Sequence, residues 1–206
     1  MALELPGLTV SGERMADKTA AEQLKEACQG AAVTIKKVER KEKSEKPPAL
    51  YDLTTLQRDA NRLLGFTAQQ TLDYLQNLYE KKLCTYPRTD SRYLTGDMAD
   101  SLPVLVNLVA NAMPFRKGIA ITCDPQTVIN DKKVTDHHAV IPTRNLKDAD
   151  LSALPAGEKA VLELVALRLL CAVAQPHIYS ETVVIAACAG GVFSAKGKTG
   201  AEKALP

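Results

Sequence analysis

The chain has 206 residues, a length that suits one or two domains. Hydrophobic residues make up 46% of it and charged residues 24%, values typical of a soluble globular protein with a sizeable core. With 26 basic and 24 acidic side chains the net charge is only +2. This balance excludes a polycationic chain, so any nucleic-acid surface has to be a local patch.

The five cysteines are scattered and form no Cys-x-x-Cys pair, which argues against a disulfide framework or a zinc site and favours a reducing interior. The longest apolar stretch, residues 161–174, is interrupted by Glu163 and Arg168 and is too short to span a bilayer. No basic leader precedes an apolar region at the N-terminus, so no signal peptide is indicated. We therefore expect a soluble cytoplasmic protein with no membrane partner.

Strand and helix signals alternate near the N-terminus. Three elements are predicted there: a weak strand at 1–10, a helix at 16–29 and a strand at 31–39. Residues 36–46 then carry six basic and three acidic side chains. One interpretation of this cluster is a contact with DNA phosphates. The interleaved glutamates favour the other, a solvated strand and linker.

The middle of the chain is mostly helical. Apolar residues recur at helical spacing in four stretches: 52–64, 68–82, 98–112 and 156–174. Thr67 and Gln70 fit a capping box at the start of the second stretch. The last stretch is strongly apolar and should be buried, whereas residues 118–143 look irregular. The inward side chains expected in the second helix are Leu72, Leu75, Leu78 and Tyr79.

Strand character returns near the C-terminus, where residues 182–187 and 192–195 flank a two-residue turn predicted at Gly190-Gly191. Strands at both ends of a helical middle indicate an α+β fold. One arrangement joins residues 1–48 and 151–206 in a strand-containing domain, into which a helical domain of residues 49–150 is inserted. Two domains in series is the alternative.

Residues 78–94, LYEKKLCTYPRTDSRYL, carry the clearest chemical signal. Tyr86 lies on a connection after the predicted helix, and Pro87 pushes it toward extended backbone, out of helical packing. Guanidinium and hydroxyl groups that bind phosphate surround this phenol: Arg88, Arg92, Thr85, Thr89 and Ser91. A nucleophilic oxygen beside phosphate-binding groups is what transesterification of a phosphodiester requires. A buried structural tyrosine beside a surface arginine is the alternative.

The ordinary pKa of a phenol, near 10, means that ionising it at pH 7 costs about 4 kcal/mol. A neighbouring cation or a proton acceptor has to offset this cost. A tyrosyl phosphodiester conserves the energy of the bond it replaces, so the strand could be rejoined without ATP.

Other signals lead away from catalysis. Gly197-Lys198-Thr199 resembles the end of a P-loop, but Val192 stands where that loop needs a glycine. No histidine has an arginine three residues later, as tyrosine recombinases require. Cys84 is either a reactive thiol or a small core residue, and we favour the core. No aromatic series suited to stacking bases is evident, so contacts should be mainly to the DNA backbone.

Three motifs, in this order along the chain, resemble the type IA DNA topoisomerases, and among these the bacterial topoisomerase III branch. They are PPALYDLTTLQRDA at 47–60, TLDYLQNLYEKKLCTYPRTDSRYL at 71–94 and DHHAVIPT at 136–143. On this pattern residues 1–48 and 151–206 correspond to the strand-passage gate domain. Residues 49–150 correspond to the inserted helical domain that carries the catalytic tyrosine.

The resemblance implies roles for seven residues. Tyr86 would cleave one DNA strand and stay attached to it through a 5′-phosphotyrosine link, while strand passage changes the topology of the DNA. Arg88 would stabilise charge beside the scissile phosphate, and His137 would contact the phosphate or assist proton movement. The others would contact DNA: Thr89, Arg92, His138 and Arg144.

The magnesium-binding domain of this family has no counterpart here, and the single Asp-x-Asp, at Asp148 and Asp150, lies in a polar turn. The resemblance therefore implies a portion of a Mg²⁺-dependent isomerase of the bacterial cytoplasm and nucleoid, acting with its remaining domains on mainly single-stranded DNA. We expect no metal in this chain and little or no activity of the chain by itself. A non-catalytic DNA-binding or interaction module with a structural tyrosine is the alternative.

Overall fold

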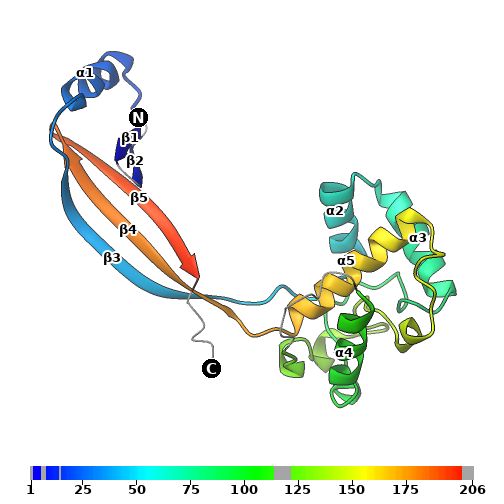
Figure 1. Cartoon of the computed structure of the whole chain (residues 1–206). Helices are drawn as coiled ribbons and strands as arrows, with labels where there is room; N and C mark the ends of the chain where they lie inside the picture. The colour runs from blue at the N-terminus through cyan, green and yellow to red at the C-terminus, as the bar shows by residue number, and fades with distance from the viewer. Residues whose placement is uncertain (1, 6–7, 14, 114–121, 201–206) are drawn as a thin grey trace. The chain divides into compact units, whose positions relative to one another are not determined.

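The structure, a computed structural model, describes residues 2–5, 8–13, 15–113 and 122–200. It contains two compact units, one built on a sheet and one on helices (Figure 1). Unit 1 consists of Met1–Glu45 and His177–Pro206, and unit 2 of Lys46–Pro176. The combination of helices with an antiparallel sheet confirms the predicted α+β class.

Unit 1 is built on a five-stranded antiparallel sheet with the order β1-β2-β5-β4-β3. The strands are β1 (Ala2–Leu5), β2 (Leu8–Gly12), β3 (Thr34–Glu45), β4 (His177–Cys188) and β5 (Gly191–Gly200). Helix α1 (Lys18–Cys28) follows β2 and begins at Asp17, whose carboxylate accepts a hydrogen bond from the Thr19 N–H at 2.8 Å. Strand β3 continues to Glu45, past the predicted end near Glu39, because its charged segment pairs with β4 throughout.

The charged side chains of β3 pair with acidic groups on the sheet. Lys37 contacts Glu39 within β3. Lys43 of β3 and Lys196 of β5 lie 2.6 Å and 2.7 Å from the carboxylate of Glu181, which projects from β4 between them. Hydrogen bonds from Lys196 and Lys43 lower the pKa of Glu181 to about 2. These internal pairs support the interpretation of the charge cluster as a solvated strand.

A small apolar cluster fastens α1 to one end of the sheet. Cys28, Cys188 and Phe193 are buried together there. A Cβ atom on Gly191 would lie 3.0 Å from the ring of Phe193 and 3.1 Å from Leu24 of α1. A larger residue at this position would therefore force the side chains of Phe193 and Leu24 to shift by a few tenths of an ångström.

The β4–β5 hairpin turns through Ala189 and Gly190, and the turn predicted at Gly190-Gly191 is wrong by one residue. Gly191 pairs with Cys188 in the sheet. The two turn residues have φ angles of 48° and 81°, the left-handed backbone of a type I′ turn. Burial of Phe193 fixes this register, which a dipeptide pattern does not reveal.

Replacing Ala189 by asparagine should raise the free energy of unfolding by about 1 kcal/mol, because asparagine tolerates left-handed backbone better than alanine does. Urea denaturation measures the change. Gly190→Ala is the matched control and should lower stability by about 1 kcal/mol. A Cβ there meets no atom within 4 Å, so its cost is conformational. Changes of the same sign in both variants would contradict the turn assignment.

The described residues of unit 2 form four α-helices and several 3₁₀ turns. Their bounds are α2 (Leu53–Leu64), α3 (Ala68–Glu80), α4 (Leu102–Ala112), α5 (Ala156–Ala172), η1 (Gly96–Met98), η3 (Pro125–Thr127), η4 (Asp131–Lys133) and η5 (Arg144–Lys147). The capping box is confirmed, since the Thr67 N–H donates to Gln70 at 2.9 Å and the Gln70 N–H donates to Thr67 at 3.1 Å. Of the segment expected to be irregular, residues 118–121 lie outside the described residues and the rest forms short turns and bridges.

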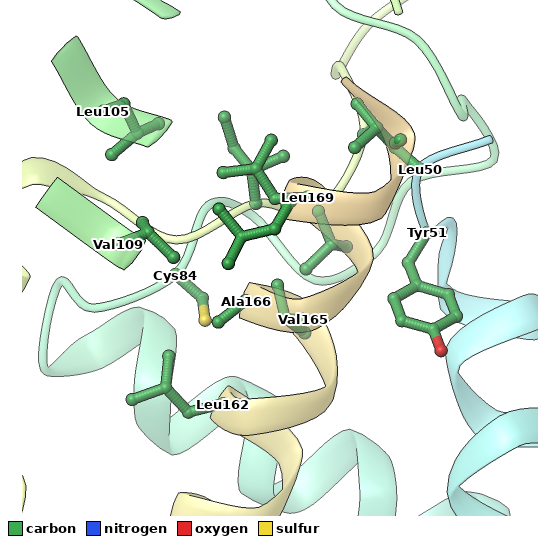
Figure 2. Packing of buried hydrophobic residues seen from close by; sticks show 14 of the residues in the cluster. Leu50, Tyr51, Cys84, Leu105, Val109, Leu162, Val165, Ala166 and Leu169 are labelled. Atoms are coloured by element: carbon green, nitrogen blue, oxygen red, sulfur yellow. The ribbon is translucent and has the colours of Figure 1, made fainter. Parts of the chain in front are cut away.

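Helix α5 forms the centre of the apolar core of unit 2. Leu162, Val165, Ala166 and Leu169 are at most 1% exposed and lie among side chains of the surrounding elements (Figure 2). The helix packs against α2, α3 and α4. The predicted boundary between residues 150 and 151 is therefore wrong: residues 151–176 belong to the helical unit, because the apolar faces of α5 complete its core. Residues 201–206 of the predicted second gate segment lie outside the described residues.

An ion pair between the buried carboxylate of Glu158 and the exposed Lys81 joins α5 to the end of α3. Glu158 is 3% exposed, and its carboxylate accepts hydrogen bonds from Asn77, at 3.0 Å, and from Lys81. We expect Lys81→Met to lower the free energy of unfolding by about 2 kcal/mol in urea denaturation, because a buried carboxylate would lose its charged partner. Lys159→Met, the same change at an exposed lysine, should stay within about 0.5 kcal/mol. Equal losses in the two variants would contradict a stabilising pair.

Candidate active site

The chain turns sharply at the end of α3, and this turn directs the segment that carries Tyr86. Lys82 has a left-handed φ of 60°. Its N–H donates to the Tyr79 carbonyl at 2.8 Å, and the Leu83 N–H donates to the Leu78 carbonyl at 2.8 Å. These two bonds around a left-handed residue make a Schellman motif. Tyr86 therefore follows the helix over a short, defined path.

Hydrogen bonds join Thr85, the residue before Tyr86, to Ala139 and Ile141. The Thr85 N–H donates to the Ile141 carbonyl at 3.0 Å, and the Ile141 N–H donates to the Thr85 hydroxyl at 3.0 Å. The same hydroxyl donates to the Ala139 carbonyl at 3.1 Å. The turn and this pairing both lie before Tyr86 and together hold the backbone that leads to it.

Cys84 is a core residue, as predicted. Its side chain is 1% exposed and points toward Ala166 of α5 (Figure 2). Burial raises the pKa of its thiol to about 12, which keeps the thiol protonated and unreactive at neutral pH.

The ring of Tyr86 contacts two other aromatic rings. The centroid of the His137 ring is 4.3 Å away with the planes inclined by 41°, and that of Tyr79 is 5.5 Å away at 81°, edge to face. Tyr86 is half-buried outside the apolar core, His137 is exposed and Tyr79 is 39% exposed. The inward position predicted for Tyr79 is wrong, because Leu75 and Leu78 fill the core face of α3.

Thr89 holds the main chain of His137. Its hydroxyl donates to the His137 carbonyl at 2.8 Å and accepts from the Ser91 N–H at 3.1 Å, and the residue is 8% exposed. The structure therefore brings Tyr86, Thr89 and His137 together. Because the Thr89 hydroxyl is buried and bonded within the protein, the phosphate contact predicted for it has no support in this geometry.

Arg88 and Arg144 both present exposed guanidinium groups. Arg88 follows Tyr86 by two residues, on the same loop. Arg144 begins η5, just after the segment that is fastened to Thr85. Both cations are therefore accessible to a phosphate in solution.

Arg92 and His138 are half-buried and each bonds to a main-chain carbonyl. The Nε of Arg92 donates to the Leu50 carbonyl at 3.3 Å. The Nδ1 of His138 donates to the carbonyl of Ala139 at 2.8 Å. Both side chains thus have a structural partner in addition to the DNA contacts predicted for them.

The described residues do not fit a magnesium site. No group of three His, Cys, Asp or Glu side chains lies close enough to hold a metal ion in residues 2–5, 8–13, 15–113 and 122–200. The Asp150 carboxylate accepts from the Ser152 N–H at 2.9 Å and from its hydroxyl at 2.6 Å, which lowers the pKa of Asp150 and places it in a turn.

A second tyrosine cluster, around Tyr51, was not predicted. The Tyr51 hydroxyl donates to Asp59 at 2.8 Å and accepts from Arg168 at 3.0 Å, and the guanidinium lies 4.1 Å from the ring centroid. Burial is the main cause that raises the pKa of Tyr51 to about 12. Tyr51 is 2% exposed and joins α5 to α2, whereas Tyr86 is half-buried and lies outside the apolar core. In the sequence Arg168 shows only as an interruption of an apolar stretch.

Comparison with known proteins shows the family of this chain. A family model described as DNA topoisomerase matches residues 7–204, which include Tyr86, Arg88 and His137. The chain belongs to the DNA topoisomerase family. It is 42% identical to DNA topoisomerase 3 of Bacillus licheniformis over 185 residues (86% of this chain) and 41% identical to that of Bacillus subtilis over 180 residues (83%). With DNA topoisomerase 3 of Shouchella clausii it shares 40% identity over 193 residues (90%). The resemblance to the topoisomerase III branch is confirmed.

The chain spans about a quarter of the length of these relatives, with shares of 25%, 24% and 26%. Among solved structures, full-length topoisomerase I from Thermotoga maritima matches 97% of this chain and 33% of its own, with a TM-score of 0.74 and 22% identity. This likeness supports the fold. Within the described part of the chain, no helix combines the length and apolar character needed to cross a membrane.

Proposed function

We propose that this chain is the tyrosine-bearing part of a type IA DNA topoisomerase and that Tyr86 forms a transient 5′-phosphotyrosine link with one DNA strand. The observation that carries the proposal is the placement of Tyr86: a half-buried tyrosine outside the apolar core, with the His137 ring at 4.3 Å and the exposed Arg88 two residues on. Tyr51, buried and bonded to Asp59, lacks this placement.

The reaction exchanges one phosphodiester for another. The phenol oxygen attacks phosphorus, the bond from phosphorus to the 3′ oxygen breaks, and the departing 3′ oxygen takes up a proton. Because the number of phosphodiester bonds is unchanged, the reverse attack rejoins the strand without ATP. Arg88 would neutralise charge on the non-bridging oxygens, and His137 would bind the phosphate or carry the proton.

The rest of the chain would serve strand passage. In this proposal unit 1 is part of the gate, unit 2 is the catalytic-tyrosine domain, and Arg92, His138 and Arg144 contact the backbone of mainly single-stranded DNA. Mg²⁺ would be held by a domain outside this chain, so the chain alone would have little or no activity. The setting would be the bacterial nucleoid.

The test uses an exchange protein, in which this chain replaces the matching segment of DNA topoisomerase 3 of Bacillus subtilis. A single-stranded oligonucleotide labelled at its 3′ end is incubated with this protein and Mg²⁺, and the reaction is stopped with detergent. Label should stay with the protein. The same oligonucleotide labelled at its 5′ end is the control and should leave the protein unlabelled, because only the 3′ part of the strand keeps the 5′-phosphate.

Trypsin digestion then identifies the attachment point. The expected labelled peptide is Leu83–Arg88, LCTYPR, in which Tyr86 is the single tyrosine. Label on another peptide would exclude Tyr86. An exchange protein that is folded and binds DNA like the relative, yet stays unlabelled, would favour the non-catalytic module.

A further inference from the structure

Tyr79 is not used in the chemistry proposed above, yet its ring contacts that of Tyr86. We propose that Tyr79 is a positioning residue, whose ring holds the side chain of Tyr86 in the rotamer that presents the phenol oxygen. This inference rests on the proposed function, because it concerns how the nucleophile is oriented.

The geometry of the contact suits this role. The two ring centroids are 5.5 Å apart and the planes meet at 81°. Edge-to-face contact is a favoured arrangement of aromatic rings, and its strength can shift a rotamer equilibrium by about 2- to 10-fold. The Tyr86 ring also contacts the ring of His137, at a centroid distance of 4.3 Å, and this contact further limits the movement of the Tyr86 side chain.

The two tyrosines stand on a rigid frame. Tyr79 lies in the last turn of α3, and its carbonyl accepts the hydrogen bond from Lys82 that closes the Schellman motif. Thr85, next to Tyr86, is fastened to Ile141. Because the backbones of Tyr79 and Thr85 are held, the contact between the rings of Tyr79 and Tyr86 determines the direction of the Tyr86 side chain.

The apolar core gives no alternative reason for an aromatic ring at position 79. Leu75 and Leu78 of α3 are fully buried and supply the core face of the helix. Tyr79 is 39% exposed and absent from the buried cluster. Its contact with Tyr86 therefore accounts for the ring better than packing of the core does.

The test measures adduct formation in the exchange protein under single-turnover conditions at saturating DNA. Tyr79→Ala should slow the formation of the Tyr86 adduct by about 2- to 10-fold while the affinity for DNA changes less than 2-fold. Tyr79→Phe should form the adduct at the native rate, because the contact with Tyr86 uses the ring of Tyr79 and not its hydroxyl. Asp73→Ala, on an exposed position of the same helix, is the matched control and should react at the native rate.

Three outcomes would overturn the inference: a native rate in Tyr79→Ala, a Tyr79→Phe variant as slow as Tyr79→Ala, or a loss confined to DNA affinity. Failure of the proposed function is distinguishable, since the unsubstituted exchange protein would then lack the adduct. NMR of the chain without DNA gives a second readout. The ring signals of Tyr86 and His137 should shift in Tyr79→Ala and stay in place in Tyr79→Phe.

Discussion

Tyr86→Phe is expected to abolish the covalent adduct between the exchange protein and DNA, with a loss of at least about 10⁴-fold, the scale found when a catalytic nucleophile is removed. The substitution deletes one oxygen and keeps the ring. Its contacts with Tyr79 and His137, at centroid distances of 5.5 Å and 4.3 Å, should therefore persist. The measurement is the amount of 3′-labelled oligonucleotide retained by the protein after a detergent stop.

The control for this variant is Tyr74→Phe, the same change at a half-buried tyrosine whose ring packs against Phe66. It should form the adduct at the native rate. Both variants should unfold within about 0.5 kcal/mol of the native chain in urea, because neither loses packing. If Tyr86→Phe still formed the adduct, Tyr86 would not be the nucleophile, and the alternative of a structural tyrosine would be favoured.

Features that depend on neighbouring residues could be predicted from the sequence. The start of α3 follows from Thr67 and Gln70, whose side chains and N–H groups pair across three residues. The end of α2 follows from Gly65, whose φ is 72°. The approach of Tyr86 to the surface likewise reflects a local cause, since Pro87 disfavours helical backbone before it.

Features that depend on packing between distant segments could not be predicted in this way. The hairpin turn falls at Ala189 because burial of Phe193 sets the register of β5. The place of α5 in unit 2 is decided by its contacts with three other helices. A periodic pattern shows that such a helix is apolar, but it does not show which partners cover it.

The same distinction between local causes and packing of distant segments applies to the residues of the candidate site. Tyr86 and Arg88 share one loop, so the local sequence predicts them together. His137 is far from Tyr86 in the sequence and contacts it only in the folded chain, so it is predicted only from the family resemblance. The helical spacing of Tyr79 from Leu75 predicts a core position that the structure does not show. The left-handed turn at Lys82, with a φ of 60°, brings the following loop back toward Tyr79. A lysine there gives no signal of such a turn.

Arg88→Ala should slow DNA cleavage by about 10²- to 10³-fold, the scale found when one group that stabilises transition-state charge is removed. The guanidinium is exposed on the loop of Tyr86 and can form two parallel hydrogen bonds to a phosphate. Affinity for DNA should fall by less than about 3-fold, because one phosphate contact is a small part of the electrostatic total. Rates come from single-turnover adduct formation in the exchange protein, and affinities from equilibrium binding without Mg²⁺.

Two further variants separate charge stabilisation from general attraction to DNA. Arg88→Lys keeps the charge and loses the paired hydrogen bonds, so its rate should lie between those of the native protein and Arg88→Ala. Arg58→Ala removes an exposed arginine of α2 and should leave the cleavage rate unchanged. If Arg88→Ala lost rate and affinity by the same factor, Arg88 would be an ordinary backbone contact, because a group that acts on the transition state must affect the rate more than the binding.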